Sequence, residues 1–301
     1  MSTGGTRSGV TRFRSARARE KFLRGYDAAF ALWPQPFDRL DVETRYGTTR
    51  VHRYGPTTGT PIVLLHGHGG NASLWYPQVE ALGAEHPVYA VDAIDDPGGS
   101  VQRAPLSTSD DYADWLDEVL DGLGLSEVHL VGHSYGGWLT LNYASRRPHR
   151  VATLTAIDPA GIEDVRTRFL FSSLVGLLRL VTRSRPMPWL ARRTANAALI
   201  IDWRVFGPSM GAIFTFGPQR SKGRRYDDGE LAAVAAPALI LIAGRTTLFH
   251  PESAAARVRS LIPHARVETI AEAGHGVPFE YPGEVNAAIL AHVGGGGGGS
   301  I

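Results

Sequence analysis

The sequence predicts an α/β protein whose mainly parallel sheet is covered by helices on both faces. Three observations predict this fold class. Short apolar runs that end in glycine or aspartate recur along the chain, as in PIVLLHG at 61–67, and continuous runs are typical of strands buried on both faces. Segments with a helical spacing of apolar residues separate these runs. Turn residues lie between the two kinds of segment, so the alternation is that of strand–helix–strand units.

The first half of the chain contains most of the predicted strands. Residues 41–54 hold two β-rich runs joined by YGTT, which predicts an antiparallel hairpin at the start of the sheet. Buried strands are expected at 61–67, 86–92 and 127–132. Residues 110–124 predict a helix that Ser109 caps, and residues 137–147 predict a second helix that stops at Pro148. A further strand is expected at 150–158.

The alternation stops at 162–228 and then returns. That segment is rich in Leu, Phe and Arg and contains no run that predicts a buried strand, so we expect a helical insertion over one edge of the sheet. A strand at 238–244, a helix at 251–263, a strand at 265–275 and a helix at 282–293 complete the pattern. The predicted domains are a basic arm with a leading helix (1–38), a core in two parts (39–161 and 229–293), a cap (162–228) and a Gly-rich flexible tail (294–301).

Composition excludes several classes of function. The 301 residues are 43% apolar and contain no cysteine, which excludes disulfides, thiolate chemistry and cysteine-ligated metal sites. No run approaches the roughly 18 apolar residues that a membrane-spanning helix needs. The N-terminus has no apolar segment typical of a secretory signal, so we expect a cytoplasmic protein. The net charge of +2 is too small to indicate a nucleic-acid partner.

The basic residues are concentrated at the N-terminus. They are either an arm for an anionic membrane or nucleic acid, or a solvated terminus with little order. We expect the solvated terminus. The residues concerned are Arg7, Arg12, Arg14, Arg17, Arg19, Lys21 and Arg24.

One serine stands where a strand meets a helix. Ser134 lies between Gly132 and Gly136 in GHSYGG (132–137), directly after a predicted strand and directly before a predicted helix. So tight a turn holds the serine in a strained conformation with its Oγ outward, and a Cβ at either glycine would clash where strand and helix cross. The following helix aims its N–H groups and positive dipole end at the same point. The setting predicts a nucleophile.

Three motifs occur in an order that resembles the α/β-hydrolase fold. They are LLHGHGG (64–70), GHSYGG (132–137) and EAGHGVPFEYP (272–282), and the similarity extends over 41–293. The insertion lies where members of this superfamily carry a cap domain. The resemblance implies that Ser134 is the nucleophile, that His275 is the general base, and that the backbone N–H groups of His68 and Tyr135 form the oxyanion hole. The serine argues against the haloalkane dehalogenases and epoxide hydrolases of the superfamily, which use a carboxylate there.

The acid departs from the usual pattern of the family. Its members usually place Asp or Glu three residues after the glycine that ends the seventh strand, whereas Gly244 is followed by Arg245, Thr246 and Thr247. Glu252 belongs to the first turn of a helix. The other location used by relatives is the end of the sixth strand, where Asp158 stands. Asp158 either completes the triad or fixes the turn DPAG that leads into the insertion.

Other polar residues are assigned structural roles. His66 and His68 lack a third ligand at a recognisable metal spacing, and the Pro-Gly-Gly turn of VDAIDDPGGS (91–100) favours a structural loop over a metal site. His133 is expected to point away from the site, because adjacent residues on a turn do not share a direction. We therefore expect neither a metal nor a cofactor.

The predicted function is that of a serine carboxylesterase. It would act through an acyl-enzyme on a small to medium hydrophobic ester, its only expected partner. One alternative is another serine-triad activity, namely C–C bond, lactone or amide hydrolysis or perhydrolysis. The other is a hydrolase-like binding protein with weakened catalysis, which the missing acid in the usual loop motivates. Apolar cap residues are expected both to pack the cap and to line the pocket: Phe169, Phe171, Leu174, Leu177, Leu178, Trp189, Phe206, Phe214 and Phe216.

Overall fold

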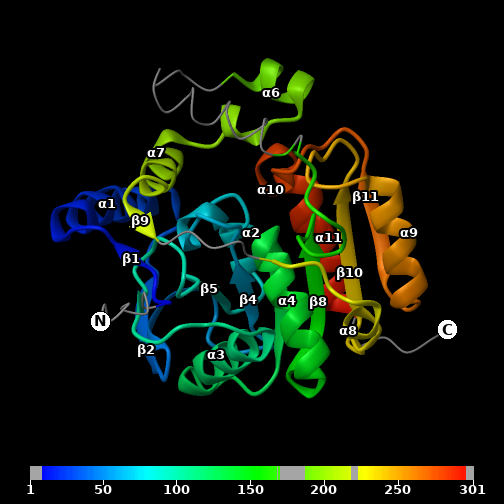
Figure 1. Cartoon of the computed structure of the whole chain (residues 1–301), viewed down its shortest axis with the longest axis horizontal. Coiled ribbons are helices and arrows are strands. Elements are labelled where there is room, and N and C mark those ends of the chain that lie inside the picture. The colour runs from blue at the N-terminus through cyan, green and yellow to red at the C-terminus, as the bar shows by residue number, and fades with distance from the viewer. Residues whose placement is uncertain (1–8, 168, 170–186, 218–222, 296–301) are drawn as a thin grey trace, which may run out of the picture.

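A twisted sheet with parallel strands at its centre organises the molecule (Figure 1). The computed structural model describes residues 9–167, 169, 187–217 and 223–295. The β4, β5, β7, β8, β10 and β11 strands pair in parallel, and β2 and β3 form the predicted antiparallel start. In spatial order the strands are β11 (Arg266–Ile270), β10 (Ala238–Ala243), β8 (Val151–Ile157), β7 (Val128–His133), β4 (Ile62–Leu65), β5 (Val88–Val91), β3 (Gly47–Tyr54) and β2 (Asp38–Thr44), with β6 (Val101–Gln102) beside β3.

Helices cover both faces of this sheet. Successive residues of β4 point to opposite faces, so Val63 and Leu65 join one buried cluster and Ile62 and Leu64 join the other. The first cluster packs under α3 (Ser109–Gly122), α4 (Tyr135–Arg146), α8 (Asp228–Ala232) and α9 (Pro251–Leu261). The second packs under α1 (Ala16–Ala29), α2 (Val79–Gly83), α10 (Val277–Glu280) and α11 (Pro282–Gly294). None of the helices in the described residues is long and apolar enough to cross a membrane.

The N-terminal segment is folded onto the rest of the chain. β1 (Arg12–Phe13) pairs antiparallel with β9 (Phe216–Gly217), and Ser15 caps the α1 helix. Phe22 and Tyr26 of α1 are buried. The expectation of a terminus with little order is thus wrong from residue 11 onward, because apolar residues at helical spacing between the arginines dock this segment.

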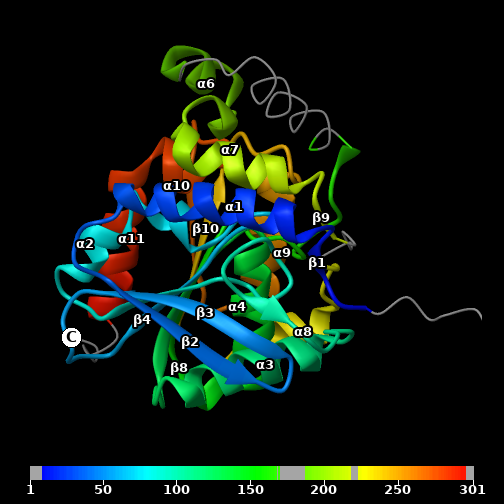
Figure 2. The same ribbon diagram turned by 90° about the vertical axis from the view of Figure 1, so that its left-hand side faces the viewer.

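The described part of the insertion is mainly helical. α6 (Pro188–Thr194), a 3-10 turn (Ala197–Leu199) and α7 (Trp203–Ala212) lie above the carboxyl ends of the strands, and α7 runs beside α1 (Figure 2). The short β9 strand follows α7. Residues 170–186, which include Phe171, Leu174, Leu177 and Leu178 of the predicted lining, lie outside the described residues. The predicted domain boundaries remain predictions.

Two local expectations need correction. Thr108, not Ser109, caps α3, through a capping box in which Asp111 binds back to the Thr108 N–H. Thr108 has the extended backbone that a cap requires, whereas Ser109 is already helical. The last strand, β11, ends at Ile270 rather than at His275, so the histidine lies in the loop after the strand.

Candidate active site

Ser134 lies on the predicted turn between β7 and α4. Its φ is 55° and its ψ is −112°, and residues with a side chain rarely adopt a positive φ. The two flanking glycines permit the close approach: a Cβ on Gly132 would lie 2.1 Å from the Gly136 carbonyl oxygen, and one on Gly136 would lie 1.8 Å from the Leu65 carbonyl oxygen. Strand and helix can therefore cross only where both positions lack a side chain.

His275 connects the serine to a carboxylate. Its Nε2 lies 2.9 Å from Ser134 Oγ, and its Nδ1 lies 2.6 Å from Asp158 Oδ2. An ionised carboxylate only accepts hydrogen bonds, so Nδ1 carries the proton of the neutral ring. Nε2 then presents its lone pair to the Ser134 hydroxyl, which is the tautomer that a general base requires.

Asp158 is fully buried at the carboxyl end of β8. Its φ of 41° turns the chain away from the strand. Its Oδ1 accepts from the Ala243 N–H at 3.1 Å, and its Oδ2 accepts from both His275 and the Thr246 hydroxyl, each at 2.6 Å. The carboxylate therefore connects β10 to the loop that carries His275. These contacts favour a role in the triad, because a residue that only fixed the turn DPAG would not need to bind His275.

Thr246 occupies the loop in which relatives usually hold the acid. Its hydroxyl donates to Asp158 and accepts from the Leu248 N–H at 3.2 Å, so its rotamer is fixed from both sides. The side chain is buried. In the sequence, Thr246 stood out only because the loop holds no Asp or Glu. Its role as a hydrogen-bond donor to Asp158 was not predicted. No local pattern in the sequence indicates this role, because it depends on how the ends of β8 and β10 lie beside each other.

His133 and Glu280 support the loop that carries His275. His133 Nε2 donates to the His275 carbonyl oxygen at 2.7 Å, and the two rings lie 5.1 Å apart. Burial, and secondarily the neighbouring His275, lower the pKa of His133 to about 3, which keeps its ring neutral. Glu280 accepts from the Gly274 N–H at 2.9 Å. The expectation that His133 points away from the site is wrong, because its ring contacts the loop that carries His275, although its role there is the structural one predicted from the sequence.

The predicted oxyanion residues adjoin the serine. Tyr135 is the first residue of α4, and a Cβ on Gly67, the neighbour of His68, would lie 3.5 Å from Ser134 Cβ. Within the described part of the chain, the His68 N–H donates to no protein acceptor. The loop is held by Asp96 Oδ1, which lies 3.2 Å from both the Gly69 N and His68 Nδ1.

The other polar residues singled out in the sequence hold loops together. His66 accepts from the Ala93 N–H through Nε2 and donates to the Gly67 carbonyl oxygen through Nδ1. Asp92 accepts from the backbone N–H groups of Ala72 and Gly99. Among the described residues no group of three or more His, Cys, Asp or Glu is arranged to hold a metal ion.

A cavity of about 450 Å³ opens onto Ser134 and His275. Cap residues form much of its wall, including Phe169, Phe206, Met210 and Ile213. Of the remaining expected lining residues that are described, Trp189 and Phe214 are exposed and Phe216 is buried beside β1. Apolar walls of this kind accept the hydrocarbon part of a ligand.

Comparison with known proteins decides the family. Residues 62–288 match the model of the alpha/beta hydrolase family. The chain belongs to this family. The resemblance and the fold class predicted from the three ordered motifs are therefore confirmed.

Two members of this family from Bacillus subtilis are similar over nearly their whole length. One is the uncharacterized carboxylesterase nap, at 29% identity over 90% of this chain and 91% of the relative. The other is the carboxylesterase YbfK, at 28% identity over 92% of this chain and 94% of the relative. Among solved structures, the naproxen esterase (carboxylesterase NP) of the same organism superposes with a TM-score of 0.80 at 25% identity, over 92% of this chain and 98% of that one.

Proposed function

We propose that this alpha/beta hydrolase is a serine carboxylesterase that acts on small to medium hydrophobic esters. One observation carries the proposal: Ser134 Oγ, both ring nitrogens of His275 and Asp158 Oδ2 form a continuous hydrogen-bonded chain, with distances of 2.9 and 2.6 Å. The carboxylesterases nap and YbfK, similar over most of their length, agree with this assignment.

The proposed mechanism has two stages. His275 Nε2 removes the Ser134 proton as Oγ attacks the ester carbonyl carbon, and the N–H groups of Tyr135 and His68 stabilise the oxyanion. The imidazolium, held by Asp158, then protonates the departing alkoxide, which leaves as the alcohol, and Ser134 keeps the acyl group. In the second stage His275 takes a proton from water, the hydroxide oxygen attacks the acyl carbon, and the proton returns to Ser134 as the acid leaves.

The cavity supports a hydrophobic substrate rather than a charged one. The cap contributes Phe169, Phe206 and Met210 to the wall of the cavity that contains Ser134. The weakened-catalysis alternative depended on a missing acid, and the contact of Asp158 with His275 argues against it. We also propose that the protein is cytoplasmic, which fractionation of cells producing it would test.

An activated ester tests the activity. A p-nitrophenyl ester of a short or medium acyl chain is expected to give a burst of nitrophenol followed by steady turnover, and an organophosphonate is expected to label Ser134 stoichiometrically. Both are lost in Ser134→Ala and kept in Ser260→Ala, which removes an exposed serine of α9. Labelling at Ser134 without turnover of any ester in a chain-length series would refute the esterase and support a binding protein.

A further inference from the structure

Basic and apolar side chains meet where the N-terminal segment passes the end of the cap. We name as the arm–cap surface the exposed side chains of Arg12, Arg14, Arg17, Ile213 and Phe214. The proposed hydrolysis uses none of the arginines and does not use Phe214. The position of the arm–cap surface in the fold indicates a second function.

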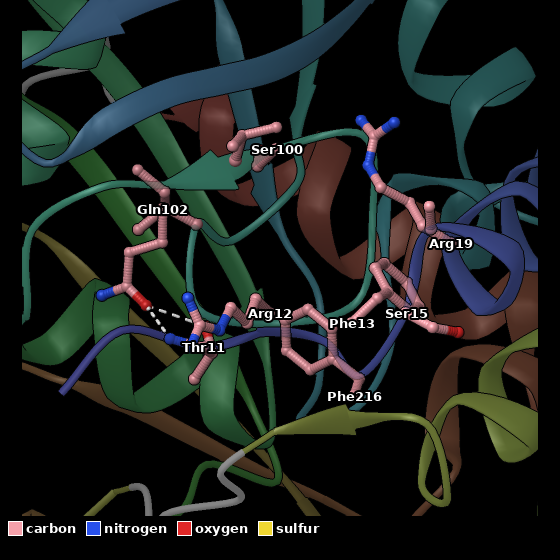
Figure 3. Close-up of a pocket in the computed structure, with 11 residues that line it drawn as sticks. Thr11, Arg12, Phe13, Ser15, Arg19, Ser100, Gln102 and Phe216 are labelled. Carbon is pink, nitrogen blue, oxygen red and sulfur yellow. Dashed lines mark hydrogen bonds between the residues drawn. The ribbon is translucent and has the colours of Figure 1, made fainter. Parts of the chain in front are cut away.

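The backbone fixes these arginines beside the cap. The Arg14 N–H donates to the Thr215 carbonyl oxygen at 2.8 Å, and Arg12 lies opposite Gly217 in the β1–β9 pair. Thr11 donates to Gln102 Oε1 through its N–H at 2.7 Å and through its hydroxyl at 2.8 Å (Figure 3). The arm is therefore held at both its strand and its start, so its charges stay next to Ile213 and Phe214.

The charges of this surface have one sign. In the described part of the chain no carboxylate forms an ion pair with Arg12, Arg14 or Arg17. The two acidic residues of α1 are paired elsewhere, Glu20 with Arg24 at 2.6 Å and Asp27 with Arg39 at 2.9 Å. A local positive potential of this kind attracts an anionic surface more strongly than the small net charge of the protein suggests.

The apolar part of the surface lies at the rim of the cavity. Ile213 is 45% and Phe214 is 53% exposed, in the turn between α7 and β9. Single exposed apolar residues are ordinary, but here two large ones are consecutive and stand beside the arginines. Ile213 also lines the cavity that contains Ser134.

We propose that the arm–cap surface docks the protein peripherally onto an anionic phospholipid bilayer. Arginines bind lipid phosphates at the interface, while side chains such as Phe enter the boundary between headgroups and acyl chains. A nucleic acid would satisfy the arginines and leave Ile213 in water, so the combination favours lipid. Given the proposed esterase activity, the position of Ile213 means that an amphipathic ester in the bilayer can reach the cavity directly.

Vesicle flotation of the full chain measures the docking without any turnover. Wild-type protein is expected to float with vesicles of phosphatidylcholine mixed with phosphatidylglycerol, and much less with phosphatidylcholine alone or at high salt. The triple variant R12Q/R14Q/R17Q is expected to bind on the order of 100-fold more weakly, at about fivefold per arginine. Phe214→Ser is expected to weaken binding by roughly tenfold.

A matched triple variant controls for charge. R225Q/R259Q/R266Q removes three exposed arginines near α8, α9 and β11, away from α1 (Figure 1), and is expected to float like wild type. Thermal unfolding and hydrolysis of a soluble ester show that each variant is folded, and both are expected to stay near wild-type values.

Three outcomes would overturn the proposal. The protein could float equally with both lipid mixtures, or the two triple variants could lose binding equally. An oligonucleotide could also displace the protein from the vesicles at a lower concentration than that of the lipid. Because flotation needs no catalysis, failure of the esterase proposal leaves this result interpretable.

Discussion

The hydroxyl of Thr246 donates to the Asp158 carboxylate at 2.6 Å, so the loop after β10 holds the acid that stands at the end of β8. The two strands are neighbours in the sheet. A carboxylate at either strand end can approach the same imidazole from adjacent positions. This chain places the acid on one strand and its hydrogen-bond donor on the other.

Replacing Thr246 with valine tests the donor. Thr246→Val keeps the shape but removes the hydrogen bond to Asp158, so the carboxylate is held less firmly against His275 Nδ1. We expect kcat for an activated ester to fall about tenfold with little change in KM. Thr246→Ser keeps a hydroxyl and is expected to stay within about threefold of wild type. A purely structural threonine would instead give equal losses in kcat for the two variants.

Removing the charge of Asp158 has a larger effect. Asn tolerates a positive φ, so Asp158→Asn keeps the backbone while replacing the anion that orients His275. We expect kcat to fall on the order of 10³–10⁴-fold, because the ring is no longer held in the productive tautomer and the imidazolium is no longer stabilised. Steady-state kinetics with the exposed Asp121→Asn as control measures this. Full activity in Asp158→Asn would remove the residue from the triad.

The acid can be moved back to the loop that relatives use. Thr246 Oγ1 lies 2.6 Å from the Asp158 oxygen that binds His275, so an aspartate at 246 brings a carboxylate close to Nδ1. The double variant Asp158→Asn/Thr246→Asp is expected to recover at least about tenfold in kcat over Asp158→Asn alone. Asp158→Asn/Thr247→Asp is the matched comparison: it places the acid three residues after Gly244, as relatives do, but Thr247 lines the cavity here, so we expect less recovery than at 246. No recovery in the first variant, or equal recovery in both, would contradict this geometry.

The sequence predicted the parts of the site that local chemistry determines. The glycines around Ser134 identify the turn because a Cβ at either position meets backbone atoms of another segment. His275 could be located because it ends the last predicted strand and lies between two glycines. Asp158 and Thr246 could not be resolved in the same way, because which strand end reaches the imidazole depends on the twist and register of β8 and β10.

Short pairings between distant segments were beyond the sequence. β1 and β9 have two residues each, too few for any periodicity to appear. Their pairing nevertheless orders the arginine-rich segment that looked solvated. A leading helix was predicted within 1–38, but the spacing of Phe22 and Tyr26, four residues apart, was not recognised as the signal that α1 docks the arginine-rich segment onto the core.

His52 makes the free energy of unfolding depend on pH, and this effect is separate from catalysis. It is buried on β3, its ring is stacked on Phe30 with centroids 4.0 Å apart, and its Nε2 lies 2.6 Å from the Tyr26 hydroxyl. Burial lowers the pKa of His52 from 6.5 to about 2. Below about pH 6.5 the His52 ring therefore binds a proton in the unfolded chain but stays neutral in the folded chain. The free energy of unfolding falls as the pH drops from that value, by up to about 1.4 kcal/mol per pH unit for this group.

Replacing His52 with glutamine removes this dependence. We expect His52→Gln to be less stable at neutral pH, because the packed ring is lost, but to lose stability more slowly on acidification, by about 1 kcal/mol per pH unit. Urea unfolding between about pH 7 and pH 5 measures the slope. His149→Gln, at an exposed position, is the control and is expected to keep the wild-type slope. Parallel stability profiles for wild type and His52→Gln would show that the buried ring does not cause the acid sensitivity.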